Sequence, residues 1–544
     1  MVESGKTVRK SFFSGVLLLS LSTFLVKIVG FLYKIPMLAY LGSVGMGYFH
    51  SAYEIYAMFC IIATAGLPVA LSVLISAALA RGDRRGVKKI YRISMTVFFV
   101  IGIVGSGLMV ALAPLFCRLI QSENAKDCII AISPTVFFVC LSSGYRGYFQ
   151  GYQRMMPTAV SQLIEAVGKL VFGLILAKWA LDQGMTPPRV AAAAGWGLTL
   201  GTAVSTGYLF VEKILQNRVE ARMTHSETAS LSEFPRRTLA ALAKLAIPMT
   251  LGASAVSLTK LIDMTMILRR LQEIGFSEAM ANEAYGSYTA LALSVYALLP
   301  SLINSISLPL IPLLSEAIER GDGMRQAIMI RFSYQLTSTV AVPASLAISA
   351  FSKPILTLLF GREADAVELA APLLSVLGVS VFLSCMITAS NSVLHAYRRV
   401  NQPILALLAG AGVKIASAYF LIGLPKIGIL GAPISTLLCN LTVVVLNLLF
   451  AAGLQKTEDL ISVFGKPLAA SIPSVGIPFC IYHLVELQSG GGRLLTVACL
   501  LSVAFLYVLL GCLLGVIGAE ELEMLPMGRH LTRLFTKMRL IRAE

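Results

Sequence analysis

Six basic side chains lie inside strongly apolar stretches of this sequence. A charged side chain near the centre of a bilayer costs a few kcal/mol to insert, so one that is retained there indicates a function. Ammonium and guanidinium groups bind phosphates and carboxylates through charge-assisted hydrogen bonds. The sequence therefore predicts a site for an anion, built from Lys27, Lys34, Arg146, Lys169, Lys260 and Lys414.

Three acidic residues, Glu54, Glu165 and Asp263, accompany these cations. Glu165 lies one helical turn before Lys169, and Asp263 lies one turn after Lys260, so each pair can neutralise itself within its own helix. Glu54 fits either a site for a coupling ion or a partner for a nearby lysine. Both interpretations of the acidic residues stay open at this point.

The remaining cations differ in how strongly they indicate substrate contact. Lys27 and Lys414 have no acidic residue within one turn of their own helix, which makes them the strongest candidates. Lys34 and Arg146 have an alternative, because long basic side chains can extend along a helix to the membrane interface. The predicted cavity contains more cations than anions and is net positive.

The elements that position these charges are predicted to be transmembrane helices. The chain is 57% hydrophobic and 13% charged, whereas soluble domains contain about 25% charged residues. Its mean hydropathy is +0.80. We expect an all-α polytopic membrane protein with fourteen spans, each able to cross a bilayer: 11–35, 46–80, 91–116, 128–152, 157–181, 189–214, 238–268, 284–318, 326–350, 367–397, 402–424, 428–454, 467–486 and 493–517.

The distribution of Lys and Arg predicts the orientation of these spans. Most of the 44 basic residues fall in alternate connections, and such loops face the cytoplasm. Both termini are then cytoplasmic, and the run 11–35 is an uncleaved first span, twice the length of a signal-peptide core. The net charge of +16 follows from this topology and from contact with anionic membrane lipids, so no nucleic-acid partner is expected.

The chain contains an internal repeat of six spans. Arg81-Gly82-Asp83 recurs as Arg320-Gly321-Asp322, and Gly47 matches Gly286 at the same offset; the segment 166–169 resembles 411–414. An even number of spans gives the two halves the same orientation. The predicted parts are an N-terminal lobe (1–214), a cytoplasmic linker (215–237), a C-terminal lobe (238–454), two further spans (455–517) and a basic amphipathic tail on the inner leaflet (518–544).

The repeat also predicts where the charges lie. At about 1.5 Å per residue, Lys169 and Lys414 lie about 18 Å from the cytoplasmic side, and Lys27 and Lys260 lie in the outer half. Helix-breaking residues occur in matching spans of the two halves and are expected to act as hinges: Gly66, Pro68, Pro309 and Pro312.

The sequence contains no motif for catalysis or ATP hydrolysis, so we expect a transporter rather than an enzyme. The nine cysteines are scattered through apolar runs, and neither they nor the five histidines form a metal-binding pattern. No cofactor is expected. Transport would be driven by Na⁺, by H⁺ or by the membrane potential, which supplies about 2.3 kcal/mol per charge per 100 mV.

Several segments resemble the MOP (multidrug/oligosaccharidyl-lipid/polysaccharide) exporter superfamily. They are Lys27–Phe31, Ala65–Ala70, Arg81–Asp83, and Arg146–Tyr152 with Met156–Thr158. The similarity is to the polysaccharide-biosynthesis branch, which includes stage V sporulation protein B and the MurJ-like lipid II flippases. The resemblance implies two six-helix lobes, alternating access, and flipping of an undecaprenyl-diphosphate-linked saccharide for the cell wall.

The resemblance is closer to sporulation-protein-B-like exporters of Gram-positive bacteria than to MurJ. Lys27 stands where MurJ proteins have arginine, and the predicted second span offers Glu54 and no cavity arginine. We therefore expect a monomeric flippase of the bacterial plasma membrane for an anionic lipid-linked saccharide. The alternatives are a cation or drug antiporter, which should need an acidic cavity, and a non-transporting scaffold for envelope synthesis.

Overall fold

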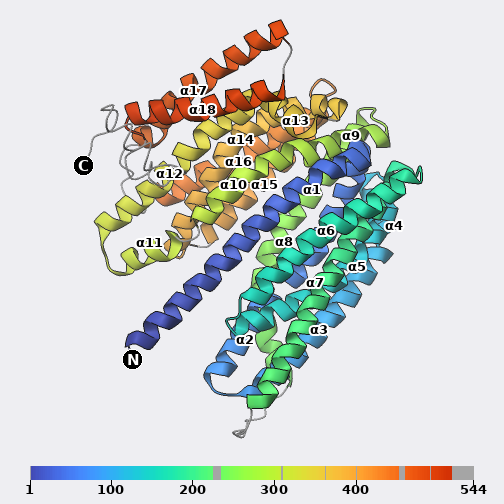
Figure 1. Ribbon diagram of the computed structural model, residues 1–544, viewed down its shortest axis with the longest axis vertical. Helices are drawn as coiled ribbons and strands as arrows, with labels where there is room; N and C mark the ends of the chain where they lie inside the picture. The colour runs from blue at the N-terminus through green and yellow to red at the C-terminus, as the bar shows by residue number, and fades with distance from the viewer. Residues whose placement is uncertain are drawn as a thin grey trace. The chain divides into compact units, whose positions relative to one another are not determined.

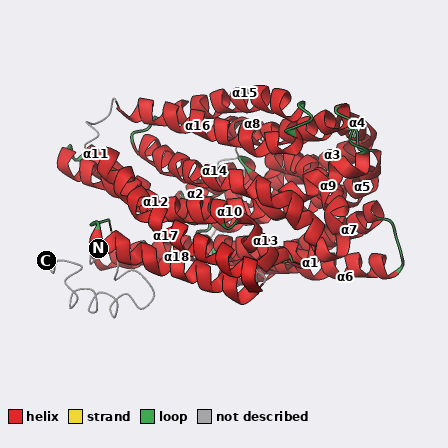
Figure 2. Cartoon of the chain, turned by 90° about the horizontal axis from the view of Figure 1, so that it is seen from above, coloured by secondary structure: helices red, strands yellow, loops and turns green. Residues whose placement is uncertain are grey.

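The computed structural model describes residues 2–223, 235–307, 310–361, 363–399, 401–452, 460–489 and 492–516. Helices dominate these residues and none of them forms a strand (Figure 2), which confirms the predicted all-α class. Within this part of the chain, ten helices are long and apolar enough to cross a membrane, or eleven if α12 and α13, bent by 79°, form one broken span. The count of fourteen spans stays a prediction.

The contacts divide the chain into two compact units, Met1–Gly286 and Ser287–Glu544. The first unit contains ten helical elements, and the last of them ends one residue beyond the boundary; Figure 1 labels its α-helices. They are α1 (Val2–Thr64), α2 (Leu67–Ala80), α3 (Arg84–Ala111), α4 (Ala113–Ile120), the 3-10 helix η1 (Glu123–Ala125), α5 (Lys126–Gly151), α6 (Met156–Asp182), α7 (Pro187–Met223), α8 (Pro235–Glu273) and α9 (Glu278–Ser287).

The second unit begins with a short π-helical segment and continues with nine α-helices and one 3-10 turn. They are η2 (Tyr288–Ala292), α10 (Leu293–Ser307), α11 (Leu310–Glu319), α12 (Gly323–Ala350), α13 (Ser352–Phe360), α14 (Ala364–Ala396), α15 (Asn401–Ile422), η3 (Gly428–Leu430), α16 (Gly431–Ala452), α17 (Leu460–Ser489) and α18 (Arg493–Leu513).

The predicted lobes follow the sequence repeat, whereas the compact units follow contacts, so the lobe boundaries stay a prediction. The helix α8, which begins the second half of the repeat, is grouped with the first unit. The helix α7 continues to Met223 and α8 starts at Pro235, so only 224–234 of the predicted linker lie outside the described residues. The predicted tail, 518–544, lies wholly outside them.

The helix α1 contains the first predicted span and the start of the second. Gly42 has φ 65° and ψ 174°, which interrupts the helix and separates the two parts. Glycine adopts this backbone conformation without the penalty that a Cβ atom brings. The second part of α1 ends at Thr64, and α2 begins at Leu67 after a turn at Ala65 and Gly66. The predicted second span is therefore a broken helix.

The second part of α1 crosses α9 at two glycines that match in the repeat. A Cβ atom on Gly47 would lie 2.1 Å from the Asn282 carbonyl oxygen, and one on Gly286 would lie 2.0 Å from that of Ser43. The Ser43 hydroxyl also donates to Glu283 Oε1 at 3.3 Å. Small residues allow helix backbones to approach closely inside a membrane. The crossing is symmetric in sequence, in agreement with the repeat.

The helices α6 and α7 also pack backbone to backbone. A Cβ atom on Gly201 of α7 would lie 2.4 Å from the Lys169 backbone nitrogen and 2.7 Å from the Gly168 carbonyl carbon. The same helix carries Gly207, around which a Cβ atom would meet no atom within 4 Å. The two glycines therefore form a matched pair.

We expect Gly201→Ala to lower the free energy of unfolding by about 1–3 kcal/mol, because overpacking forces the two helix backbones apart. Gly207→Ala should leave stability unchanged or raise it by up to about 1 kcal/mol, since alanine is the better helix former. Unfolding of both variants in detergent measures the difference. Equal destabilisation by the two substitutions would contradict the close α6–α7 packing.

Candidate functional site

Three of the predicted charged residues form one ion cluster in the first unit. Glu165 of α6 pairs through Oε1 with Lys169 Nζ at 2.6 Å and through Oε2 with Arg146 Nη2 of α5 at 2.8 Å. The three side chains are 13%, 23% and 15% exposed, respectively. One carboxylate thus forms ion pairs with two cations, and all three side chains are largely buried. We call these residues, with Ser161, the Glu165 cluster.

The stripe of polar residues on α6 explains why the cluster forms. Ser161, Glu165 and Lys169 recur every four residues, which places them on one face of the helix. Arg146 Nε donates to Ser161 Oγ at 3.0 Å, and Ser161 Oγ donates to the Thr158 carbonyl at 2.7 Å. Arg146 is therefore held at two points by α6 and does not extend away from it.

The second part of α1 supplies an aromatic wall to the Glu165 cluster. Tyr53, Tyr56 and Cys60 interact electrostatically with Glu165, and Tyr53 and Cys60 also with Lys169. The rings of Tyr53 and Tyr56 lie 5.5 Å apart between centroids. Tyr56 and Cys60 are buried. This side of the cluster excludes water, which strengthens its electrostatic interactions.

A second group of titratable residues lies along α1. Lys34 is half-buried and lies within electrostatic range of Glu54 and His50. His50 is 9% exposed, and its Nε2 atom has no hydrogen-bond partner among the described residues. Glu54 therefore lies near Lys34, a relation that the helical spacing alone did not single out.

The other predicted cations lie on helices other than α5 and α6, which carry the Glu165 cluster. Lys27 of α1 and Lys260 of α8 are exposed in the first unit, and Asp263 is half-buried. Lys414 of α15 is half-buried in the second unit. No role is tested for any of these residues, and their contact with a substrate stays a prediction.

The second half of the repeat does not contain a copy of the Glu165 cluster. The positions equivalent to Arg146 and Glu165 are Asn391 and Gly410, while Lys169 corresponds to Lys414. Asn391 Oδ1 accepts a hydrogen bond from Asn447 Nδ2 at 2.8 Å. The repeat therefore keeps the lysine, but replaces the charged partners by a neutral residue and a glycine.

Two of the four predicted hinge residues lie at a break between described helices. Gly66 and Pro68 are buried at the break between α1 and α2, and a Cβ atom on Gly66 would lie 2.2 Å from the Ala246 carbonyl oxygen of α8. Pro309 lies outside the described residues, between α10 and α11, and Pro312 lies within α11. Whether these breaks move during function stays a prediction.

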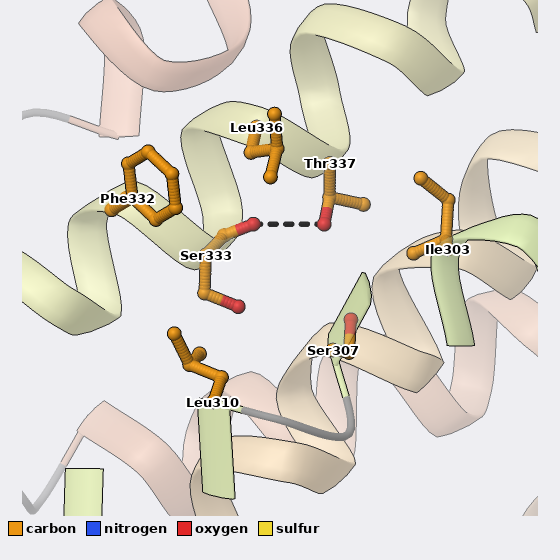
Figure 3. A pocket seen from close by; sticks show the side chains of 7 residues that line it. All are labelled: Ile303, Ser307, Leu310, Phe332, Ser333, Leu336 and Thr337. Atoms are coloured by element: carbon orange, nitrogen blue, oxygen red, sulfur yellow. Dashed lines mark hydrogen bonds between the residues drawn. The ribbon is translucent and has the colours of Figure 1, made fainter. Parts of the chain in front are cut away.

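A small pocket in the second unit is lined by the end of α10, the start of α11 and α12 (Figure 3). It is mainly apolar, with two serine hydroxyls and one threonine hydroxyl, and Thr337 Oγ1 donates to the Ser333 carbonyl at 2.8 Å. None of the predicted cations lines it. Its lining residues are Ile303, Ser307, Leu310, Phe332, Ser333, Leu336 and Thr337.

One buried cation was not recognised in the sequence. Lys213 of α7 is 7% exposed, and its Nζ lies 3.5 Å from the ring centroid of Tyr148 and 4.8 Å from that of Tyr91. Cation–π contacts of this kind are worth about 2 kcal/mol when desolvated. Lys213 joins the ends of α3, α5 and α7. The sequence clue lies in the segment Arg146–Tyr152, in which Tyr148 supplies one of the two rings.

The Glu165 cluster carries the groups that an anion site needs. Its two cations carry one positive charge more than its single carboxylate, and a phosphate can accept hydrogen bonds from both Lys and Arg. Among the described residues no group of three His, Cys, Asp or Glu side chains could hold a metal ion. The arrangement is therefore suited to binding a phosphate or a carboxylate.

Family comparisons place the chain among known membrane proteins. Residues 12–318 match the model described as polysaccharide biosynthesis protein, and residues 286–420 match the MatE model. Stage V sporulation protein B of Bacillus subtilis (strain 168) is 24% identical over 530 residues, which cover 96% of this chain and 100% of that protein. Lipid II flippase MurJ of the same organism is 26% identical over 417 residues, covering 74% and 75%.

A solved structure shows the same fold. The structure described as lipid II flippase MurJ in an inward closed conformation superposes with a TM-score of 0.68 at 14% identity. The match covers 91% of this chain and 98% of the other. The similarity at this identity establishes the architecture.

Proposed function

Because the chain belongs to the polysaccharide biosynthesis protein family of the MOP superfamily, we propose that it is a secondary transporter of the flippase type. It moves an anionic undecaprenyl-diphosphate-linked saccharide, either lipid II or a related cell-wall, spore or polysaccharide precursor, across the plasma membrane by alternating access. Two relatives named as a sporulation protein and a lipid II flippase support this proposal. It has no enzymatic activity.

The observation that carries the proposal is the shared carboxylate of Glu165. Two basic side chains, Arg146 and Lys169, contact it within 2.8 Å, so an incoming diphosphate can replace it and meet both. Lys27, Lys260 and Lys414 are proposed to contact the same substrate at other stages, with Lys34 as a further cation. Such an excess of positive charge favours an anion over a cation as cargo.

The energy source is proposed to be an ion gradient or the membrane potential. Glu54, with Lys34 and His50 close by, is the proposed site for a coupling Na⁺ or H⁺. A diphosphate can also use the potential directly, since each charge gains about 2.3 kcal/mol per 100 mV. We propose that the protein is monomeric, that both termini are cytoplasmic, and that the host is a Gram-positive bacterium.

A second candidate is a cation or drug antiporter, which the MatE match over residues 286–420 favours. A third is a non-transporting scaffold for envelope synthesis. Native mass spectrometry of the protein purified from its host membrane separates the three. We expect a copurified isoprenyl-diphosphate saccharide, lost in an Arg146→Gln, Lys169→Gln variant that still folds. Purification without such a lipid, together with drug-dependent Na⁺ or H⁺ exchange in proteoliposomes, would favour the antiporter instead.

A further inference from the structure

The turn from α2 to α3 and the start of α3 carry a dense group of basic residues. All are exposed except Lys89, which is half-buried. The segment 81–92 contains one acidic residue, Asp83, and its carboxylate already accepts a hydrogen bond from the Gly86 backbone nitrogen at 2.7 Å. We call this surface the α3 basic face: Arg81, Arg84, Arg85, Lys88, Lys89 and Arg92.

The second half of the repeat contains the same turn without the same charge. Gly82 and Gly321 both have positive φ, 72° and 69°. Asp322 accepts a hydrogen bond from the Arg325 backbone nitrogen at 3.0 Å, as Asp83 does from Gly86. The positions that correspond to Arg84, Arg85, Lys88 and Lys89 are Gly323, Met324, Ala327 and Ile328. The turn therefore forms without these four cations.

Neither topology nor helix stability accounts for the additional charge. The sequence repeat predicts the same orientation for the two turns, so a need for positive loops applies to both. Arg84 and Arg85 occupy the first turn of α3, where the positive end of the helix dipole disfavours cations. The charge of the first half is thus retained at a cost.

The location of the α3 basic face suits a lipid headgroup. It lies at the end of the first unit where α7 also ends (Figure 1). Near this end, Lys213 of α7 lies over the ring of Tyr91 of α3. In the proposed orientation this end is cytoplasmic and faces the inner leaflet. Basic residues near that surface are attracted by anionic headgroups.

We propose that the α3 basic face captures the diphosphate of the lipid-linked substrate at the inner leaflet, before the substrate reaches the Glu165 cluster. This inference rests on the proposed function and orientation. Attraction to bulk anionic phospholipids applies to every cytoplasmic turn and does not single out one of them. The segment 81–92 has six basic residues and its counterpart 320–331 has three, Arg320, Arg325 and Arg331. The additional charge of the first half therefore fits a ligand that approaches the protein at one place.

The test compares two variants of the full-length protein that lose the same charge. The capture variant is Arg84→Gln, Arg85→Gln, Lys88→Gln, Lys89→Gln. The control variant is Arg118→Gln, Lys126→Gln, Lys178→Gln, Arg189→Gln, which removes four exposed cations elsewhere in the first unit. Binding in detergent is measured with farnesyl diphosphate and with dioctanoylphosphatidylglycerol, and flipping is measured in proteoliposomes with a fluorescent undecaprenyl-diphosphate disaccharide.

We expect the capture variant to bind farnesyl diphosphate about tenfold or more weakly, whereas the control variant stays within twofold of wild type. In the flipping assay the half-saturating substrate concentration of the capture variant should rise by a similar factor. Its maximal rate should stay unchanged, because capture precedes translocation. Unchanged affinity, or an equal loss for phosphatidylglycerol, would overturn the assignment. If wild type flips the disaccharide and the capture variant matches it at every concentration, the capture surface alone is wrong. If wild type neither binds nor flips, the proposed function fails as well.

Discussion

Replacing Glu165 by alanine is expected to lower the free energy of unfolding by about 3–5 kcal/mol. The substitution leaves Arg146 and Lys169, both largely buried, without the carboxylate that each contacts. Removing one partner of a buried ion pair exposes the full desolvation penalty of the charges that remain. The aromatic wall of α1 limits the water that could replace the carboxylate. This is the largest stability effect that we expect from a single substitution in the first unit.

The matched control is Glu316→Ala. Glu316 pairs with Arg320 over the same number of residues, but the two side chains are 44% and 66% exposed. Exposed pairs contribute about 0–1 kcal/mol. Thermal unfolding of both variants in the same detergent measures the difference. Equal stability of the two variants would show that the Glu165 cluster is solvated in the functional protein.

The double substitution Lys27→Ala, Lys414→Ala is expected to reduce flipping of an undecaprenyl-diphosphate disaccharide at least about a hundredfold. Each lysine is proposed to make a charge-assisted hydrogen bond to the substrate, worth about 1.5–3 kcal/mol. A loss of 1.4 kcal/mol corresponds to a factor of ten. The initial rate of flipping at substrate concentrations below half-saturation is the quantity to measure.

The charge-preserving variant Lys27→Arg, Lys414→Arg serves as the control and should retain transport to within about tenfold. Its unfolding midpoint and that of the alanine variant should lie close to wild type, because Lys27 is exposed and Lys414 half-buried. Full activity of a folded alanine variant would remove both lysines from the proposed binding site and leave the Glu165 cluster, Lys260 and Lys34.

The helical class and the ion pair of α6 could be predicted from the sequence because both depend on local spacing. The repeat could be predicted because several pairs of matching residues share one offset. Glu165 and Lys169 are four residues apart, so any helix brings them together. Gly47 and Gly286 share an offset with the Arg-Gly-Asp turns, and the structure places both at one crossing of α1 and α9. Broken helices were also foreseen, since Gly66 and Pro68 interrupt an apolar run.

The rest of the site depends on tertiary packing, which spacing does not reveal. Arg146 lies nineteen positions before Glu165. Only the packing of α5 against α6 decides that its side chain binds the carboxylate and does not extend to the membrane interface. Lys213 follows an apolar run, so the sequence places it in a loop at the end of a predicted span. In the structure, one tyrosine ring from α3 and one from α5 lie against it. The grouping of α8 with the first unit likewise follows from contacts between distant segments.

The measurement that tests the central claim most directly is flipping by the wild-type protein in proteoliposomes. The fluorescent undecaprenyl-diphosphate disaccharide is compared with an undecaprenyl glycolipid of equal chain length that lacks the diphosphate, with and without a membrane potential. We predict rapid flipping of the diphosphate-linked lipid and not of the glycolipid. The rate should change when the potential is reversed. Equal rates for both lipids, or no rate above that of protein-free liposomes, would contradict a cation-lined site for an anionic lipid.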